Sequence, residues 1–212
     1  MASGAELQDG WSRRQWLGGA AALAVVLGLP VGHSVMSSLA HDAAPSRAQR
    51  MLLDEVCQLV LPRTGTPGAG EVGTGAFVVL ALAHGLENAR KPLPFNAGEE
   101  LLRHRRRDGT LDHLGWLEAE LDRRAGGRFL SASPTVRHDT LAALDAAAYA
   151  PEVQGHPWRT LKTLILTGYY TSEVGGAEEL RFELVPGRYD PDLPLAPGDR
   201  AWSSDWTAVD FG

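Results

Sequence analysis

Cysteine is almost absent from this sequence, because Cys57 is the only one among 212 residues. A single thiol excludes a C-x-x-C-H haem attachment site, an iron–sulfur cluster and a cysteine-rich zinc site. Two interpretations of Cys57 remain open. It is either a small buried apolar residue of an expected helix or, in an exported protein, half of a disulfide with a partner chain.

Other catalytic signatures are also missing. The histidines at 84, 104, 113, 138 and 156 never pair at i,i+4, and neither an H-E-x-x-H zinc motif nor a G-x-S-x-G nucleophile motif occurs. We therefore assign no catalytic, cofactor-binding or metal-binding residue to this chain. The alternative is a self-sufficient enzyme that uses Glu173 or His156 near a glycine-rich turn.

The sequence lacks a surplus of positive charge. Its net charge is −6, and the same value remains when residues 1–40 are left out. Phosphate backbones are bound mainly by an excess of lysine and arginine. Nucleic acid is therefore excluded as a partner.

Long apolar runs are missing as well. The uncharged stretch from Leu17 to Leu29 has 13 residues, which as a helix would span about 20 Å of a hydrocarbon core about 30 Å thick. Arg13 and Arg14 stand just before it, so residues 1–40 resemble a twin-arginine export signal. The expected location is the periplasm. An uncleaved signal would leave a weak membrane tether.

What the sequence does contain predicts a mainly α fold. Residues 41–190 form a compact multi-helix domain, a short β-prone segment lies near 180–185, and residues 191–212 form an extended aromatic tail that packs on its own domain or on a partner. Apolar spacing, prolines and glycines predict helices over 47–61, 76–84, 98–107, 111–124, 134–149 and 158–169.

The loop over residues 62–75 contains a G-x-G-x-x-G pattern from Gly68 to Gly73. A dinucleotide site needs a strand directly before the first glycine, and here an expected helix precedes it. We interpret the pattern as a surface loop. A second pattern is the basic run 103–107, which is either a solvated face or a contact for acidic partner groups or anionic lipid headgroups.

The densest aromatic and apolar run outside the N-terminus spans His156 to Tyr189. It predicts a packed helix that is broken by Gly168 and by the pair Gly175-Gly176, followed by an irregular surface. This arrangement favours a docking face over an active site.

Two segments resemble the gluconate 2-dehydrogenase subunit 3 family. PRTGTPGA at 62–69 resembles the family's P-x-T-x-TPGA loop, with Gly65 where an aspartate is common, and GYYTSE at 168–173 followed by VPGRY at 185–189 resembles a second motif. The resemblance covers about residues 50–195. It implies a non-catalytic small subunit of a periplasmic dehydrogenase whose GMC-type catalytic subunit carries FAD and oxidises a sugar, sugar acid or polyol.

In many relatives of this family a multihaem cytochrome c subunit passes the electrons on. The resemblance thus implies that FAD lies in the partner, haem c in a third subunit, and no cofactor in this chain. The complex or an uncleaved signal would hold it at the periplasmic face of the inner membrane. A flavoprotein that folds around FAD in the cytoplasm and lacks its own signal also needs an escort, and this chain would supply the signal.

Aromatic side chains dominate protein–protein contact patches. The predicted interface anchors are therefore Trp158, Tyr169, Tyr170, Tyr189 and Trp202. A membrane-tethered assembly factor that leaves after export is the remaining alternative.

Overall fold

The computed structural model describes residues 44–181 and 196–203. The predicted export signal with Arg13 and Arg14, the anchor Tyr189, most of the predicted β-prone segment and most of the tail lie outside these residues. The predictions made for them stay predictions.

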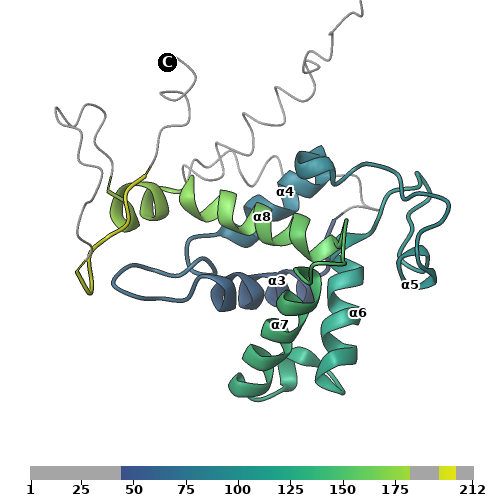
Figure 1. The fold of residues 1–212 in the computed structure, drawn as a ribbon, viewed down its shortest axis with the longest axis horizontal. Coiled ribbons are helices and arrows are strands. Elements are labelled where there is room, and N and C mark those ends of the chain that lie inside the picture. Colours follow the sequence, from purple (N-terminus) through teal and green to yellow (C-terminus); the bar gives the residue numbers. More distant parts are fainter. Residues whose placement is uncertain (1–43, 182–195, 204–212) are drawn as a thin grey trace, which may run out of the picture.

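The predicted mainly α fold is confirmed, and the described residues contain no β-sheet (Figure 1). The helices are α3 (Arg47–Val60), α4 (Thr74–His84), α5 (Glu99–Leu102), α6 (His113–Ala125), α7 (Pro134–Ala148) and α8 (Pro157–Tyr170). Three short helical turns complete the order: η2 (Leu86–Asn88), η3 (Phe129–Ser131) and η4 (Val174–Glu179). η4 is a π-helical turn.

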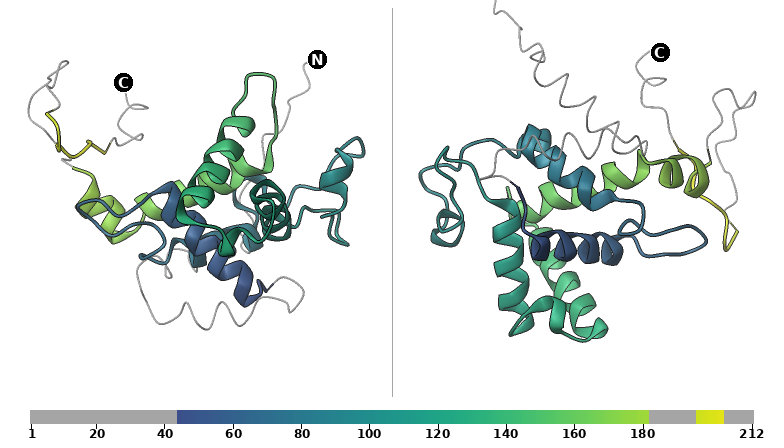
Figure 2. Two further views of the ribbon diagram at one scale, coloured as in Figure 1. Left: turned by 90° about the horizontal axis from the view of Figure 1, so that it is seen from below. Right: turned by 180° about the vertical axis from the view of Figure 1, so that it is seen from behind.

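The core lies where α4, α8 and α3 pack together. In Figures 1 and 2, α4 runs beside α8, α3 lies against both, and α6 and α7 project from this group as a pair. α4 is apolar on most sides and seven of its 11 residues are buried, as expected for a central helix. Among the described residues, no helix combines the length and apolar character that a membrane crossing requires.

Local sequence sets the starts of three helices. Ser46 and Gln49 form a capping box at the start of α3, in which each side chain bonds to the other residue's backbone N–H. Ser133 caps α7 ahead of Pro134, and the imidazole of His156 accepts a hydrogen bond from the N–H of Trp158 at the start of α8. These caps satisfy N–H groups that have no partner within their own helix.

The helix predicted over 98–107 is wrong beyond its first turn, because only Glu99–Leu102 is helical. The chain instead turns back on itself. Arg105 pairs antiparallel with Leu111, and the N–H of Arg106 donates to the carbonyl of Thr110 at 2.8 Å. These backbone bonds replace the helical ones.

Gly168 does not break α8, contrary to the prediction, since the helix continues to Tyr170. Its role is close packing. A Cβ at this position would lie 2.5 Å from Cδ1 of Phe77 on α4. The missing side chain therefore lets α8 approach α4.

Candidate docking surface

Segments far apart in the sequence meet at one end of the molecule (Figure 1, left). They are the loop 62–73 after α3, residues 168–181 with the end of α8 and η4, and the returning segment 196–203. We call this region the corner. It brings together two of the sequence motifs singled out above, PRTGTPGA and GYYTSE.

The loop 62–73 has a defined shape because its own groups bond to one another. The N–H of Ala69 donates to the carbonyl of Leu61 at 2.9 Å, and the N–H of Gly68 donates to the Glu71 carboxylate at 2.8 Å. Arg63 forms an ion pair with Glu71 at 2.9 Å. The bond from Gly68, followed by that from Arg63, lowers the pKa of Glu71. The Glu71 carboxylate thus stabilises the loop by bonding to two other residues within it.

This geometry agrees with a surface loop at the G-x-G-x-x-G pattern. Helix α3, not a strand, precedes the pattern, and the N–H of Gly70 donates to Gln58 of α3 at 3.2 Å. A Cβ at Gly70 would lie 2.6 Å from the carbonyl oxygen of Asp54. The glycine serves close packing of the loop on α3 and not a phosphate group.

Hydrogen bonds join the loop to α8 and η4. The hydroxyl of Tyr169 donates to the carbonyl of Pro67 at 3.1 Å and lies 3.3 Å from the hydroxyl of Thr66. Thr66 in turn donates to the carboxylate of Glu179. These contacts connect residues more than 100 positions apart, so the corner forms only when the whole domain has folded.

η4 keeps the backbone close to the end of α8. Ser172 donates its hydroxyl to the carbonyl of Tyr169 at 2.6 Å and accepts a bond from the N–H of Gly175 at 3.1 Å. A Cβ at Gly175 would lie only 2.1 Å from that same Tyr169 oxygen. A glycine is therefore required for this turn.

The returning segment 196–203 attaches to the end of η4. The N–H of Arg181 donates to the carbonyl of Ala201 at 2.8 Å, and the N–H of Ser203 donates to the carbonyl of Arg181 at 2.7 Å. The Arg181 guanidinium lies 6.0 Å from the centroid of the Trp202 ring, at the outer limit of a cation–π contact. Trp202 is thereby placed at the corner.

Two predicted anchors are exposed here. Tyr170 is 37% exposed and Trp202 is 45% exposed. The Tyr170 ring meets Tyr169 edge to face at 5.2 Å, and partial burial, with the nearby Glu179 carboxylate, raises the pKa of Tyr170. The corner thus presents two neutral aromatic groups on a hydrogen-bonded base.

Two other predicted anchors are core residues. Trp158 is 1% exposed and its indole N–H donates to Asp145 at 2.7 Å, while Tyr169 is 3% exposed. Side chains so buried cannot contact a partner at the surface of this domain. The interface prediction is therefore corrected for both residues, which stabilise the core and the base of the corner.

Cys57 is buried, with 0% of its surface exposed. Burial, followed by the charge of Asp54, strongly raises the pKa of its thiol. The thiolate is the form that reacts, so Cys57 is inert in the folded domain. The buried-residue interpretation is confirmed, and the alternative of a disulfide to a partner is not supported.

His156 and Glu173, either of which the enzyme alternative would use, do not come together. His156 precedes the start of α8 and Glu173 follows its end, so about 21 Å of helix separates them. Burial lowers the pKa of His156, whose Nδ1 is occupied as the cap of α8. Each residue therefore lacks the other as a chemical partner.

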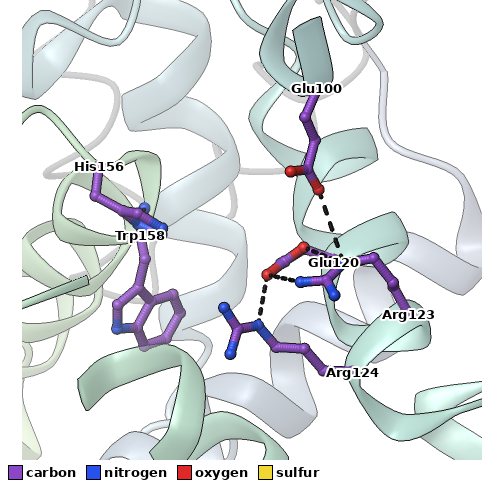
Figure 3. Close-up of polar contacts among 6 residues, drawn as sticks. All are labelled: Glu100, Glu120, Arg123, Arg124, His156 and Trp158. Carbon is purple, nitrogen blue, oxygen red and sulfur yellow. Dashed lines mark hydrogen bonds and ion pairs between the residues drawn. The ribbon is translucent and has the colours of Figure 1, made fainter. Parts of the chain in front are cut away.

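A cluster that sequence reasoning missed surrounds Glu120 on α6 (Figure 3). Arg123 donates to this carboxylate at 2.7 and 2.9 Å, Arg124 donates at 2.5 Å, and Glu100 lies 3.8 Å from Arg123. Burial would raise the pKa of Glu120, but the two arginines outweigh it and lower the pKa. Arg123 and Arg124 follow Glu120 by three and four residues, and this spacing could have predicted the ion pairs from the sequence. The cluster is a fully paired structural network.

A hollow of about 170 Å³ lies beside Asp145 and Lys162, between α3, α7 and α8. Small-molecule sites usually span about 300–1,000 Å³, and the ammonium of Lys162 already pairs with Asp145 at 2.7 Å. Within residues 44–181 and 196–203, no three metal-binding side chains gather at one point. The corner is therefore the best candidate functional surface.

Comparison with known proteins identifies one family. A search of the curated proteins finds no match, and a search of the solved structures finds none. The sequence model of one family, described as gluconate 2-dehydrogenase subunit 3, matches residues 47–187 and so includes the loop 62–73, the end of α8 and η4. Since this match covers most of the chain, the protein belongs to the gluconate 2-dehydrogenase subunit 3 family.

Proposed function

We propose that this chain is the non-catalytic small subunit of a periplasmic GMC-type, FAD-dependent dehydrogenase, and that it binds the catalytic subunit through the corner. Its family is that of subunit 3 of a dehydrogenase complex, which agrees with an accessory role. A multihaem cytochrome c completes the proposed complex, and the partner's substrate is a sugar, sugar acid or polyol.

One observation carries the proposal. The two motifs PRTGTPGA and GYYTSE meet at one hydrogen-bonded corner that presents Tyr170 and Trp202 to the outside. Aromatic residues on a preorganised base lose little conformational freedom on binding, which makes them effective anchors. The polar groups beneath them bond to one another, so the corner offers contact surface and not reactive groups.

The binding test uses co-expression of the tagged full chain with the dehydrogenase encoded beside it. The expected result is a colourless chain when it is purified alone and a yellow complex when both are expressed. Replacing Tyr170 and Trp202 together by alanine should weaken the complex by a factor of about 100 or more, as loss of two anchors does. The matched control is Tyr149→Ala, since Tyr149 is 49% exposed on another part of the surface.

Two outcomes would overturn this proposal. One is a yellow, active enzyme obtained from this chain alone. The other is a complex that survives the double variant as well as it survives Tyr149→Ala.

The escort role is the second part of the proposal, and it depends on the candidate signal. Replacing Arg13 and Arg14 by lysine should leave both proteins in the cytoplasm, because the export system reads the arginine pair. Cell fractionation with an immunoblot for each subunit measures this. Continued export of the flavoprotein alone would contradict the escort role and leave the binding role intact.

A further inference from the structure

Residues 89–112, between η2 and α6, form an arm that extends away from the helical body. Figures 1 and 2 show its helix α5 apart from the other helices, at the opposite end of the long axis from the corner. The arm nevertheless has a defined shape. The N–H of Leu93 donates to the carbonyl of Gly109 at 2.9 Å, and Arg106 pairs with Asp112 at 3.0 Å. These bonds join the two segments of chain that lead to and from the tip, residues 94–102.

The tip of the arm, residues 94–102, exposes two large apolar side chains to solvent. Phe95 is 97% exposed and Leu102 is 37% exposed, whereas the neighbouring Leu93 and Leu101 pack against the core. A phenylalanine so exposed gains favourable free energy as soon as an apolar environment covers it. No other described residue provides that cover.

The arm carries more positive than negative charge, with six lysines and arginines against four aspartates and glutamates in residues 89–112. Arg103 pairs with Glu99 and Arg106 with Asp112. The exposed side chains of Lys91, Arg105 and Arg107 form no ion pair with any residue of the described ranges. These cations occur in a chain whose net charge is −6. The arm thus combines exposed cations that have no described ion-pair partner with an exposed aromatic group.

We propose that the arm binds the surface of an anionic membrane, with Phe95 inserted at the level of the headgroups and Lys91, Arg105 and Arg107 paired with lipid phosphates. Exposed aromatic residues flanked by basic ones are the usual components of interfacial membrane contacts. An acidic protein surface would match the charges equally well, but protein anchors usually lie at the centre of a well-packed apolar patch, and the arm exposes only Phe95 and Leu102 as large apolar side chains. Because the arm lies opposite the corner, a partner at the corner leaves it free for the lipid.

The test uses the purified full chain with vesicles of phosphatidylglycerol and phosphatidylcholine, and with vesicles of phosphatidylcholine alone. Since Cys57 is buried, an environment-sensitive fluorophore can be attached selectively to Asn96→Cys, beside Phe95. We expect a blue shift of the emission, and quenching by brominated lipids, only with the anionic vesicles. This local reporter distinguishes the arm from any other segment of the chain that binds lipid.

Variants measure the contribution of each side chain to vesicle binding. Phe95→Ser should lower the partition coefficient by about tenfold or more, and replacing Lys91, Arg105 or Arg107 by glutamine should lower it by about fivefold each. The matched controls, Met51→Ser for an exposed apolar group and Arg47→Gln with Arg128→Gln for exposed cations, should leave it unchanged.

An unshifted emission with anionic vesicles would overturn the proposal. So would a shift caused by the co-purified dehydrogenase in the absence of vesicles, which would assign the arm to a protein partner. Equal losses in the arm variants and in the control variants would also contradict it.

Discussion

The two ends of α8 carry similar residue types but present opposite surfaces. At its start, Trp158 is 1% exposed, bonds to Asp145 and lies beneath the cap formed by His156. At its end, Tyr170 is 37% exposed, beside a corner that also exposes Trp202. One end thus directs its aromatic group into the core, and the other directs it to the outside.

The difference shows that the position of an aromatic residue along a helix does not decide its role. What decides is whether another element covers it. α7 supplies Asp145 to the indole of Trp158, whereas the elements at the corner bond to Tyr169 and leave Tyr170 partly exposed. Core stability and partner binding should therefore be separable by mutation at the two ends.

Trp158→Ala should have the largest effect of the variants that test this separation. Removal of a fully buried indole leaves a cavity, and such changes usually lower the free energy of unfolding by about 3–5 kcal/mol. Asp145 would also lose one of its donors. Urea denaturation followed by circular dichroism measures the loss. A change below about 1 kcal/mol would show that the start of α8 is not a core site.

The second largest effect is expected from acid, which should lower the free energy of unfolding through His113 and His156. Burial lowers the pKa of His113 on α6 to about 4 and also lowers that of His156, so the folded state favours the neutral imidazoles. The contribution of these histidines to stability is therefore complete above about pH 6.5, the pKa of histidine in the unfolded chain. It is lost as the pH falls toward 4, and His113 alone accounts for up to about 3 kcal/mol of the free energy of unfolding.

Denaturation curves between pH 7 and pH 4 test this pH dependence. His113→Gln should flatten it, whereas Tyr170→Ala at the other end of α8 should not. A steeper loss in His113→Gln than in the unmodified chain would contradict the assignment.

Gly175→Ala should have a smaller effect, confined to the corner. The new Cβ would lie 2.1 Å from the Tyr169 carbonyl oxygen, so the turn must shift at a cost of about 1–3 kcal/mol. Hydrogen exchange should increase in residues 168–181 and remain unchanged around Trp158. Gly127→Ala is the control, because nothing lies within 4 Å of its added Cβ.

The smallest effect on stability is expected for Tyr170→Ala combined with Trp202→Ala. Both side chains are partly exposed, and exposed substitutions usually change the free energy of unfolding by less than about 0.5 kcal/mol each. Thermal unfolding of the isolated chain measures this. A loss comparable to that of Trp158→Ala would mean that these residues belong to the core and not to a docking surface.

Much of the fold could be predicted from the sequence because its signals are local. Apolar spacing and the flanking prolines predicted α3 and α7 nearly to the residue, and the caps at Ser46 and Ser133 stand at their starts. The helix predicted over 98–107 failed because Arg105 and Arg106 find backbone partners across a turn, at Leu111 and Thr110. The Asp108-Gly109 pair marks the turn, but no local signal shows that backbone pairing reaches back to Arg105.

The candidate site was harder to predict because it depends on contacts between distant segments. The bond from Thr66 to Glu179 joins residues 113 positions apart, and neither residue is notable alone. Trp158 and Trp202 also look alike in the sequence, yet only one of them is covered. Burial of an individual aromatic residue is a tertiary property.

The isolated cysteine has a consequence for how the chain matures. With one thiol, the fold contains no internal cross-link, and because Cys57 is sealed in the core its covalent state does not depend on the redox poise around it. The domain can therefore reach the same native structure in a reducing compartment or in an oxidising one. Oxidative folding enzymes have nothing to contribute to it on either side of a membrane.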